Sequence, residues 1–124
     1  MGIKLFLDDY RLPEDVFRLT IDFDYEKNSE WIIVKSYDEF IAYILQNTIP
    51  EIISFDHDLT QDHYLPNNQY EIDYGTIKKT GYHALLWLIR HCTENKIDLP
   101  KCKIHSQNNS GKENMNNLLN QYLK

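Results

Sequence analysis

Short apolar runs that end in acidic residues are the feature of this sequence that most restricts its fold. Residues 3–7 are almost entirely apolar and are followed by an Asp-Asp pair at 8–9. Residues 51–55 form a similar run, which is followed by Asp-His-Asp at 56–58. Runs of this length and composition are typical of strands that are buried on both faces. The repetition predicts polar groups at the carboxyl ends of two buried strands.

Further elements alternate with these two strands along the chain. Residues 31–35 have the same apolar character as residues 3–7, and residues 102–105 are a fourth, weaker strand. A capping-box pattern at Ser36 and Glu39 predicts a helix over residues 37–46. Two later helices are predicted from apolar residues at helical spacing. The apolar residues of the first helix are Tyr82, Leu85, Leu86 and Ile89, after a capping Thr80. Those of the second, near the C-terminus, are Met115, Leu118, Leu119 and Tyr122.

Strands that alternate with helices predict an α/β fold with a mostly parallel sheet of about four strands between helical layers. The length of 124 residues fits a single domain over 1–124. A polar stretch at about 59–79 is longer than an ordinary connection, and is expected to be a lid or a surface insertion. In open parallel sheets, ligands bind outside the carboxyl ends of the strands, where the acidic clusters fall.

Charge and composition exclude several functions. Thirteen Lys and Arg against 19 Asp and Glu give a formal charge of −6, which argues against binding duplex DNA through its backbone. A nucleotide ligand remains compatible with this charge if a metal or a helix N-terminus offsets the repulsion. No apolar run approaches the ~20 residues of a membrane span, and two cysteines make no disulfide framework. We therefore expect a soluble, cytoplasmic protein.

Four carboxylates are expected at one edge of the sheet. Like charges held this close are costly unless a cation or shared protons relieve them. A divalent ion with oxygen ligands is the simplest relief, and Mg²⁺ or Mn²⁺ suits such ligands best. The alternative is that some of these acids only cap helices or turns. The predicted metal ligands are Asp8, Asp9, Asp56 and Asp58.

Two histidines lie at strand ends and are candidates for proton transfer. An imidazole can give or take a proton near neutral pH, and a pair can serve as acid and base across a phosphoester. His57 lies between two acids, and His105 ends the fourth strand beside Ser106. The alternative for His57 is a ring packed against a helix, because strand alternation points it away from Asp56 and Asp58.

The loop after the fourth strand and one arginine are candidates for binding phosphate. Residues 106–111, Ser-Gln-Asn-Asn-Ser-Gly, combine small polar side chains with a helix N-terminus, and we expect Ser106, Asn108 and Gly111 to contribute. The alternative is an ordinary capped helix start. Arg11 can hold a phosphate as a bidentate donor, or else form a surface ion pair with Glu14 or Asp15.

Four motifs occur in order along nearly the whole chain. They are Leu-Phe-Leu-Asp-Asp-Tyr-Arg-Leu-Pro (5–13), Ser-Phe-Asp-His-Asp-Leu (54–59), Thr-Gly-Tyr (80–82) and His-Ser-Gln-Asn-Asn-Ser-Gly-Lys-Glu-Asn-Met (105–115). Together they resemble the cyclic-phosphate processing receiver-like family, which is related to response-regulator receivers. That family is thought, largely from context, to process cyclic phosphates on nucleotides or RNA ends. The resemblance therefore implies a flavodoxin-like receiver fold.

The resemblance also implies roles for individual residues. It assigns Asp8 and Asp9 to the acidic metal-binding pair of a receiver, Asp56 to the phosphoacceptor position and Ser106 to the hydroxyl residue after the fourth strand. The residues that match what sets this family apart are His57, Asp58, His105 and Asn108. Because the chain ends after the helix that follows the fourth strand, we expect the fifth receiver strand and its lysine to be absent, which argues against phosphorelay signalling.

Three functions are compatible with these observations. The first is a metal-assisted phosphodiesterase that opens a cyclic phosphate on a nucleotide or RNA end, with His57, His105 and Asp56 as catalytic residues. The second is a non-catalytic receiver-like module that binds a nucleotide or a protein partner of unknown identity. The third is a phosphatase with Asp8 or Asp56 as covalent nucleophile.

Overall fold

The fold is built on a parallel β-sheet. The computed structural model describes residues 3–26, 30–57, 79–106 and 108–123, and within them four parallel strands pair in the order β2-β1-β3-β4. The strands are β1 (Lys4–Leu7), β2 (Ile32–Val34), β3 (Ile52–Phe55) and β4 (Lys101–Ile104). The helices are α1 (Pro13–Thr20), the short 3₁₀ helix η1 (Phe23–Tyr25), α2 (Tyr37–Gln46), α3 (Gly81–Glu94) and α4 (Asn109–Leu123).

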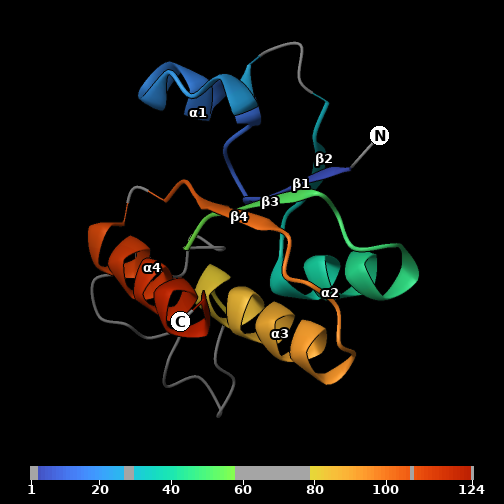
Figure 1. Cartoon of the computed structure of the whole chain (residues 1–124). Helices are drawn as coiled ribbons and strands as arrows, with labels where there is room; N and C mark the ends of the chain where they lie inside the picture. The colour runs from blue at the N-terminus through green and yellow to red at the C-terminus, as the bar shows by residue number, and fades with distance from the viewer. Residues whose placement is uncertain (1–2, 27–29, 58–78, 107, 124) are drawn as a thin grey trace, which may run out of the picture.

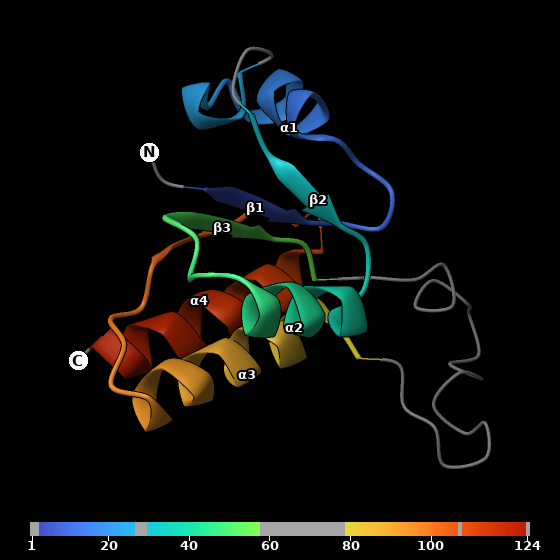
Figure 2. The same cartoon turned by 90° about the vertical axis from the view of Figure 1, so that its right-hand side faces the viewer.

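Helices cover both faces of the sheet (Figures 1 and 2). In both views α2, α3 and α4 lie on one face, and α1 lies on the other. The larger apolar cluster joins the sheet to α2, α3 and α4, and a smaller one on the α1 side contains Phe6, Val16 and Tyr25. This three-layer arrangement confirms the predicted flavodoxin-like receiver fold with a parallel sheet.

The strand at residues 31–35 differs from its prediction. We expected it to be buried on both faces, but Ile32 and Ile33 are 40% and 36% exposed and only Val34 of β2 is buried. The reason is its place at the end of the strand order, where it pairs with β1 alone among the described strands. The other predicted strands lie where the sequence placed them, within one or two residues at each end.

The predicted helices are confirmed, and their starts follow from local hydrogen bonds. The Ser36 hydroxyl accepts from the backbone N–H of Glu39, and the Glu39 carboxylate accepts from the N–H of Lys35, so α2 begins at Tyr37. The stripe on α4 is buried deepest at Met115, whereas Tyr122, at its far end, is 36% exposed.

The register of the strands brings three polar side chains to one edge of the sheet. Leu7 pairs with Phe55, and Phe55 pairs with Ile104, so β1, β3 and β4 end level with one another. The residues that follow are Asp8, Asp56 and His105, and backbone hydrogen bonds continue the ladder to them. Because side chains alternate along a strand, these three share the face of Phe6, Ser54 and Lys103, which is the α1 side.

A close contact fixes the start of α3 against the end of β3. The N–H of Gly81 donates to the His57 carbonyl at 2.7 Å, and a Cβ at Gly81 would lie 1.6 Å from the Asp56 carbonyl oxygen. Only glycine fits there. The start of α3 is therefore held directly beside the residues that follow β3.

Two further points from the sequence concern the long polar insertion and membrane-spanning segments. Nearly all of the predicted insertion at 59–79 lies outside the described residues, as does Asp58. Among the helices that the structure describes, none combines the length and apolar character needed to cross a membrane.

Candidate metal and phosphate site

Asp8, Asp56 and His105 form a buried polar group at the carboxyl edge of the sheet. Each offers one potential ligand atom, and the three atoms lie within 4.8 Å of one another. The side chains of Asp8 and His105 are each only 1% exposed. Buried ionisable groups of this kind are rare unless they are paired or bind a metal. Two of the four predicted metal ligands, and one of the two predicted catalytic histidines, thus meet at one point.

Both oxygens of the Asp8 carboxylate accept hydrogen bonds. Oδ1 accepts from the backbone N–H groups of Tyr10 and Arg11, each at 2.9 Å, because the chain turns directly after β1. Oδ2 lies 3.0 Å from Nε2 of His105. These contacts fix the orientation of a carboxylate that has almost no access to solvent.

The His105 ring is held by a stacking contact and by a hydrogen bond at each ring nitrogen. Its ring stacks on Phe6 with centroids 4.4 Å apart and planes 4° from parallel. Nδ1 lies 2.6 Å from the Ser54 hydroxyl, so both ring nitrogens take part in hydrogen bonds. Burial lowers the pKa of His105 below its ordinary value, although the neighbouring Asp8 works in the opposite direction. The imidazole is therefore neutral at pH 7.

The donor set of this group suits a divalent cation. Two ligands that are each about 2.2 Å from an ion lie at most about 4.4 Å apart, close to the 4.8 Å span of the three atoms. Carboxylates favour Mg²⁺ and Mn²⁺, while an imidazole is common with later transition metals. Within this described group, Asp8 and Asp56 supply carboxylate oxygens of the kind expected from the sequence for Mg²⁺ or Mn²⁺. Asp9 is half-buried and is not a member of this three-residue group.

His57 lies in different surroundings from His105. Its ring packs against α4, so closely that a Cβ at Gly111 would come within 2.3 Å of the His57 Cγ. This is the packed arrangement that strand alternation offered as the alternative for His57. The two imidazoles are therefore not brought together as an adjacent pair: His105 faces the α1 side, and His57 faces α4.

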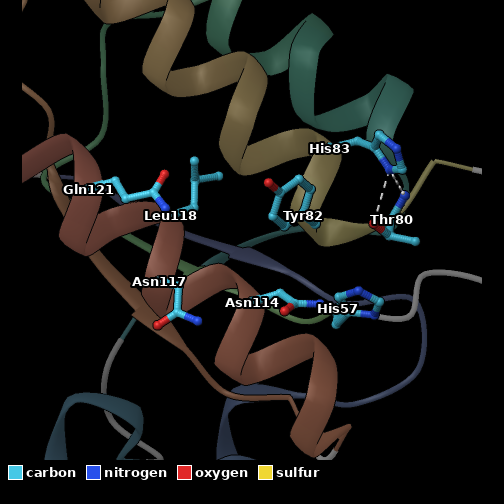
Figure 3. Close-up of a pocket in the computed structure, with 8 residues that line it drawn as sticks. All are labelled: His57, Thr80, Tyr82, His83, Asn114, Asn117, Leu118 and Gln121. Carbon is cyan, nitrogen blue, oxygen red and sulfur yellow. Dashed lines mark hydrogen bonds between the residues drawn. The ribbon is translucent and has the colours of Figure 1, made fainter.

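His57 also lines a pocket of about 490 Å³ between α3 and α4 (Figure 3). In the close-up, His57 and Asn114 lie at one end and Gln121 lies toward the other, with Tyr82 of α3 facing the pocket. Among the residues that the structure describes, the lining carries amide, hydroxyl and imidazole groups rather than carboxylates or ammonium groups. The sequence predicts no functional role for Tyr82, Asn114 or Asn117. Tyr82 lies on the apolar stripe of its predicted helix, and amides on a helix give no specific signal.

The loop after β4 forms a capped helix start. The Ser106 hydroxyl accepts from the N–H of Asn108, and the Asn108 side-chain oxygen accepts from the N–H of Gly111 at 2.9 Å. The Gly111 N–H is thus used within the loop, and this glycine serves the packing of His57. Ser106 is buried beside His105, whereas Gln107 is outside the described residues.

Positive charge lies close to the buried acids. The charges of Arg11 and Lys112 both act to lower the pKa of His105. The surface ion pair considered for Arg11 is not observed in the described part of the chain, where Glu14 and Asp15 pair with Arg18 instead. The charge of Arg11 therefore acts on this group, and its binding of a phosphate stays a prediction.

Sequence reasoning missed two residues that contact this group, Ser54 and Tyr25. Strand alternation alone places Ser54 on the face of Asp56, so that signal was present in the sequence. Tyr25 comes from η1, a 3₁₀ turn in a mixed, charged segment, and nothing in the local pattern pointed to it. Its hydroxyl lies 2.6 Å from that of Ser54.

Comparison with known protein families matches residues 3–121 to the cyclic-phosphate processing receiver domain. The chain belongs to this family. No curated protein and no solved structure matches the chain. In this cyclic-phosphate processing receiver domain, the buried group at the sheet edge contains two residues that the resemblance placed at the receiver's acidic and phosphoacceptor positions, Asp8 and Asp56. The family name also indicates a role in the processing of cyclic phosphates.

The buried, neutral His105 predicts a loss of stability in acid. Its pKa is lower in the folded protein than in the unfolded chain, so the unfolded state binds more protons as the pH falls below about 6.5. Stability should therefore decrease as the pH falls through 6.5 toward the folded pKa. Urea unfolding at pH 8, 7, 6 and 5 measures this, and His105→Gln should flatten the slope. An equal pH dependence of stability in His105→Gln would contradict the assignment of this effect to His105.

Proposed function

We propose that this domain is a metal-assisted phosphodiesterase that hydrolyses a cyclic phosphate on a nucleotide or an RNA end. The observation that carries this proposal is the buried group of Asp8, Asp56 and His105 at the carboxyl edge of the sheet, in a member of a family named for cyclic-phosphate processing. Such edges are where ligands bind in open parallel sheets.

Asp8 and Asp56 are the proposed metal ligands that belong to the buried group, and Asp9 and Asp58 are further proposed ligands. Mg²⁺ or Mn²⁺ is the proposed ion because the paired carboxylates supply oxygen ligands. When bound, a divalent ion supplies Lewis acidity and offsets negative charge on the phosphate. The contacts to Oδ1 and Oδ2 of Asp8 hold its carboxylate in a fixed orientation for such a ligand.

The proposed reaction adds water across one P–O ester bond of the ring. The water oxygen bonds to phosphorus, one ester oxygen departs as a hydroxyl group, and the product is a phosphomonoester. A proton must leave the water and another must reach the departing oxygen. We propose His57 for proton transfer, because it is half-buried, follows Asp56 directly and lines the pocket. His105, with both nitrogens hydrogen bonded, is proposed to act by holding Asp8.

Binding of the phosphate is proposed to involve Arg11 and the loop after β4. The guanidinium of Arg11 and the ammonium group of Lys112 bring positive charge close to His105. Ser106 and Asn108 contribute polar groups at the start of α4, and Gly111 lets the helix approach His57. These two cations offset the charge of the two buried acids, which lowers the repulsion that an anionic ligand would meet in a protein whose net charge is −6.

The pocket beside His57 is proposed to hold the nucleoside part of the substrate. Its volume of about 490 Å³ falls in the usual range for small-molecule sites, roughly 300–1,000 Å³. Amide side chains of Asn114, Asn117 and Gln121 suit the hydrogen-bonding edges of a base, and Tyr82 offers an aromatic face for stacking. A nucleotide or RNA end is therefore the proposed partner.

A second candidate function is supported by the separation of the two histidines. Because His57 packs on α4 and His105 is hydrogen-bonded to Asp8, the described part of the site holds no acid–base pair of adjacent imidazoles. A domain that binds a cyclic nucleotide without cleaving it would need the pocket and the cationic groups but no proton transfer. Turnover of a cyclic nucleotide distinguishes the phosphodiesterase from the binding domain.

The metal proposal predicts a thermal shift. Mn²⁺ or Mg²⁺ should raise the melting temperature, because an ion that binds only the folded protein stabilises it by mass action. Asp56→Asn should lose most of that shift, since it removes a ligand charge. Asp98→Asn, at an exposed position after α3, is the matched control and should keep the shift. An unchanged shift in Asp56→Asn would place the ion elsewhere.

The catalytic proposal predicts turnover of a cyclic phosphate. With 2′,3′-cyclic nucleotides as probes, the protein with Mn²⁺ should release the monoester, and His57→Ala should lower the rate by roughly 10² to 10⁴. His91→Ala, on α3 and stacked on Trp87, serves as the control and should retain the rate. Chromatographic separation of diester and monoester measures the product. Binding of these nucleotides without any cleavage would favour the binding module instead.

A further inference from the structure

A continuous chain of hydrogen bonds runs from Tyr25 to the buried Asp8. The Tyr25 hydroxyl lies 2.6 Å from the Ser54 hydroxyl, which lies 2.6 Å from Nδ1 of His105. Nε2 of the same ring lies 3.0 Å from Oδ2 of Asp8. All four side chains are buried, so the chain joins η1, β3, β4 and β1 within the protein interior.

The direction of each hydrogen bond follows from the last acceptor. Oδ2 of the Asp8 carboxylate accepts, so Nε2 of His105 carries a proton and donates it. In a neutral imidazole the other nitrogen then has no proton, and Nδ1 must accept from the Ser54 hydroxyl. Ser54 has only that one proton to give, so its oxygen accepts from the hydroxyl of Tyr25. Every donor in the chain therefore points toward Asp8.

Tyr25 is well suited to begin this chain. Burial raises its pKa to about 12, so the phenol keeps its proton at neutral pH and can always donate. Its ring stacks on Trp31 at 5.3 Å, and Nζ of Lys103 lies 5.2 Å from the ring centroid. Lys103 is in turn ion-paired with Asp22 and Asp24 beside η1, which ties this turn to β4.

We propose that Tyr25 and Ser54 are positioning residues of the candidate metal site, which hold the His105 ring with Nε2 toward Asp8 and thereby fix the orientation of the Asp8 carboxylate. The proposal rests on the proposed function in that Asp8 is taken as a metal ligand. Groups that hydrogen bond to a ligand fix its orientation, and their loss typically lowers metal affinity about 10- to 100-fold. Apolar side chains of similar volume are often equally stabilising in a core, so stability alone does not require this chain of bonds.

The tautomer gives a test that needs no metal and no substrate. Nitrogen-15 NMR of the imidazole in the metal-free protein at pH 7 should show Nε2 protonated and Nδ1 unprotonated in His105. Ser54→Ala removes the donor to Nδ1 while Asp8 still accepts from Nε2, so we expect a displaced Nδ1 resonance with the same tautomer. A protonated Nδ1 in the wild type, or an unchanged Nδ1 resonance in Ser54→Ala, would overturn the proposal.

Metal affinity gives the second readout. In Mn²⁺ titrations by calorimetry, Ser54→Ala should weaken binding, by less than the roughly 10- to 100-fold typical for loss of a group that hydrogen bonds directly to a ligand, and Ser54→Thr, which keeps the hydroxyl, should restore most of it. Cys92→Ala, a truncation in the larger apolar cluster, controls for lost stability and should leave both readouts unchanged. Equal affinities in Ser54→Ala and Cys92→Ala would contradict the proposal.

Tyr25→Phe is a second variant that tests the proposal if Ser54→Ala does not fold. It removes one hydroxyl and leaves Ser54 able to donate, so we expect a displaced Nδ1 resonance and a smaller loss of affinity; no displacement would overturn the proposal. Failure of the wild type to bind Mn²⁺ would overturn the positioning role as well as the metal site. Metal binding with an opposite His105 tautomer would overturn the positioning role alone.

Discussion

The buried carboxylate of Asp8 is the constraint on which the rest of the site depends. A carboxylate with almost no solvent access costs several kcal/mol unless hydrogen bonds replace its hydration, and a buried group that loses its hydrogen-bond partner typically costs about 1–3 kcal/mol, more when it is charged. Two backbone N–H groups after β1 and the imidazole of His105 supply those bonds. Because these donors come from both β1 and β4, the polar site exists only when β1, β3 and β4 are paired in register.

The same two-residue period of the strands builds the apolar support and the polar site together. On the α1 side of the sheet, Phe6 precedes Asp8 by two positions and Ser54 precedes Asp56 by two, so an aromatic ring and a hydroxyl lie beneath the acids. His105 then stacks on Phe6 and bonds to Ser54. These contacts fix the orientation of the Asp8 carboxylate, and a fixed ligand geometry favours metal binding and phosphate chemistry.

Much of this architecture could be predicted from periodicity, and the failures have physical causes. Runs that end in acid located β1 and β3, and their level ends brought Asp8 and Asp56 together. Periodicity could not show that β2 would be an edge strand with exposed isoleucines, because strand order depends on the tertiary fold. Alternation did predict the packed alternative for His57, whose ring lies against α4, while the catalytic role of the two histidines stays a prediction. Tyr25 was not predictable, since its role depends on where η1 packs rather than on its neighbours in sequence.

The central claim is that Asp8 and Asp56 together form a divalent-cation site. Anomalous X-ray diffraction from crystals grown with Mn²⁺ tests it most directly, because the manganese signal locates the ion without prior assumption. The account predicts one strong peak within about 2.2 Å of a carboxylate oxygen of both residues. A peak bound only to other residues, or no peak at saturating Mn²⁺, would contradict it.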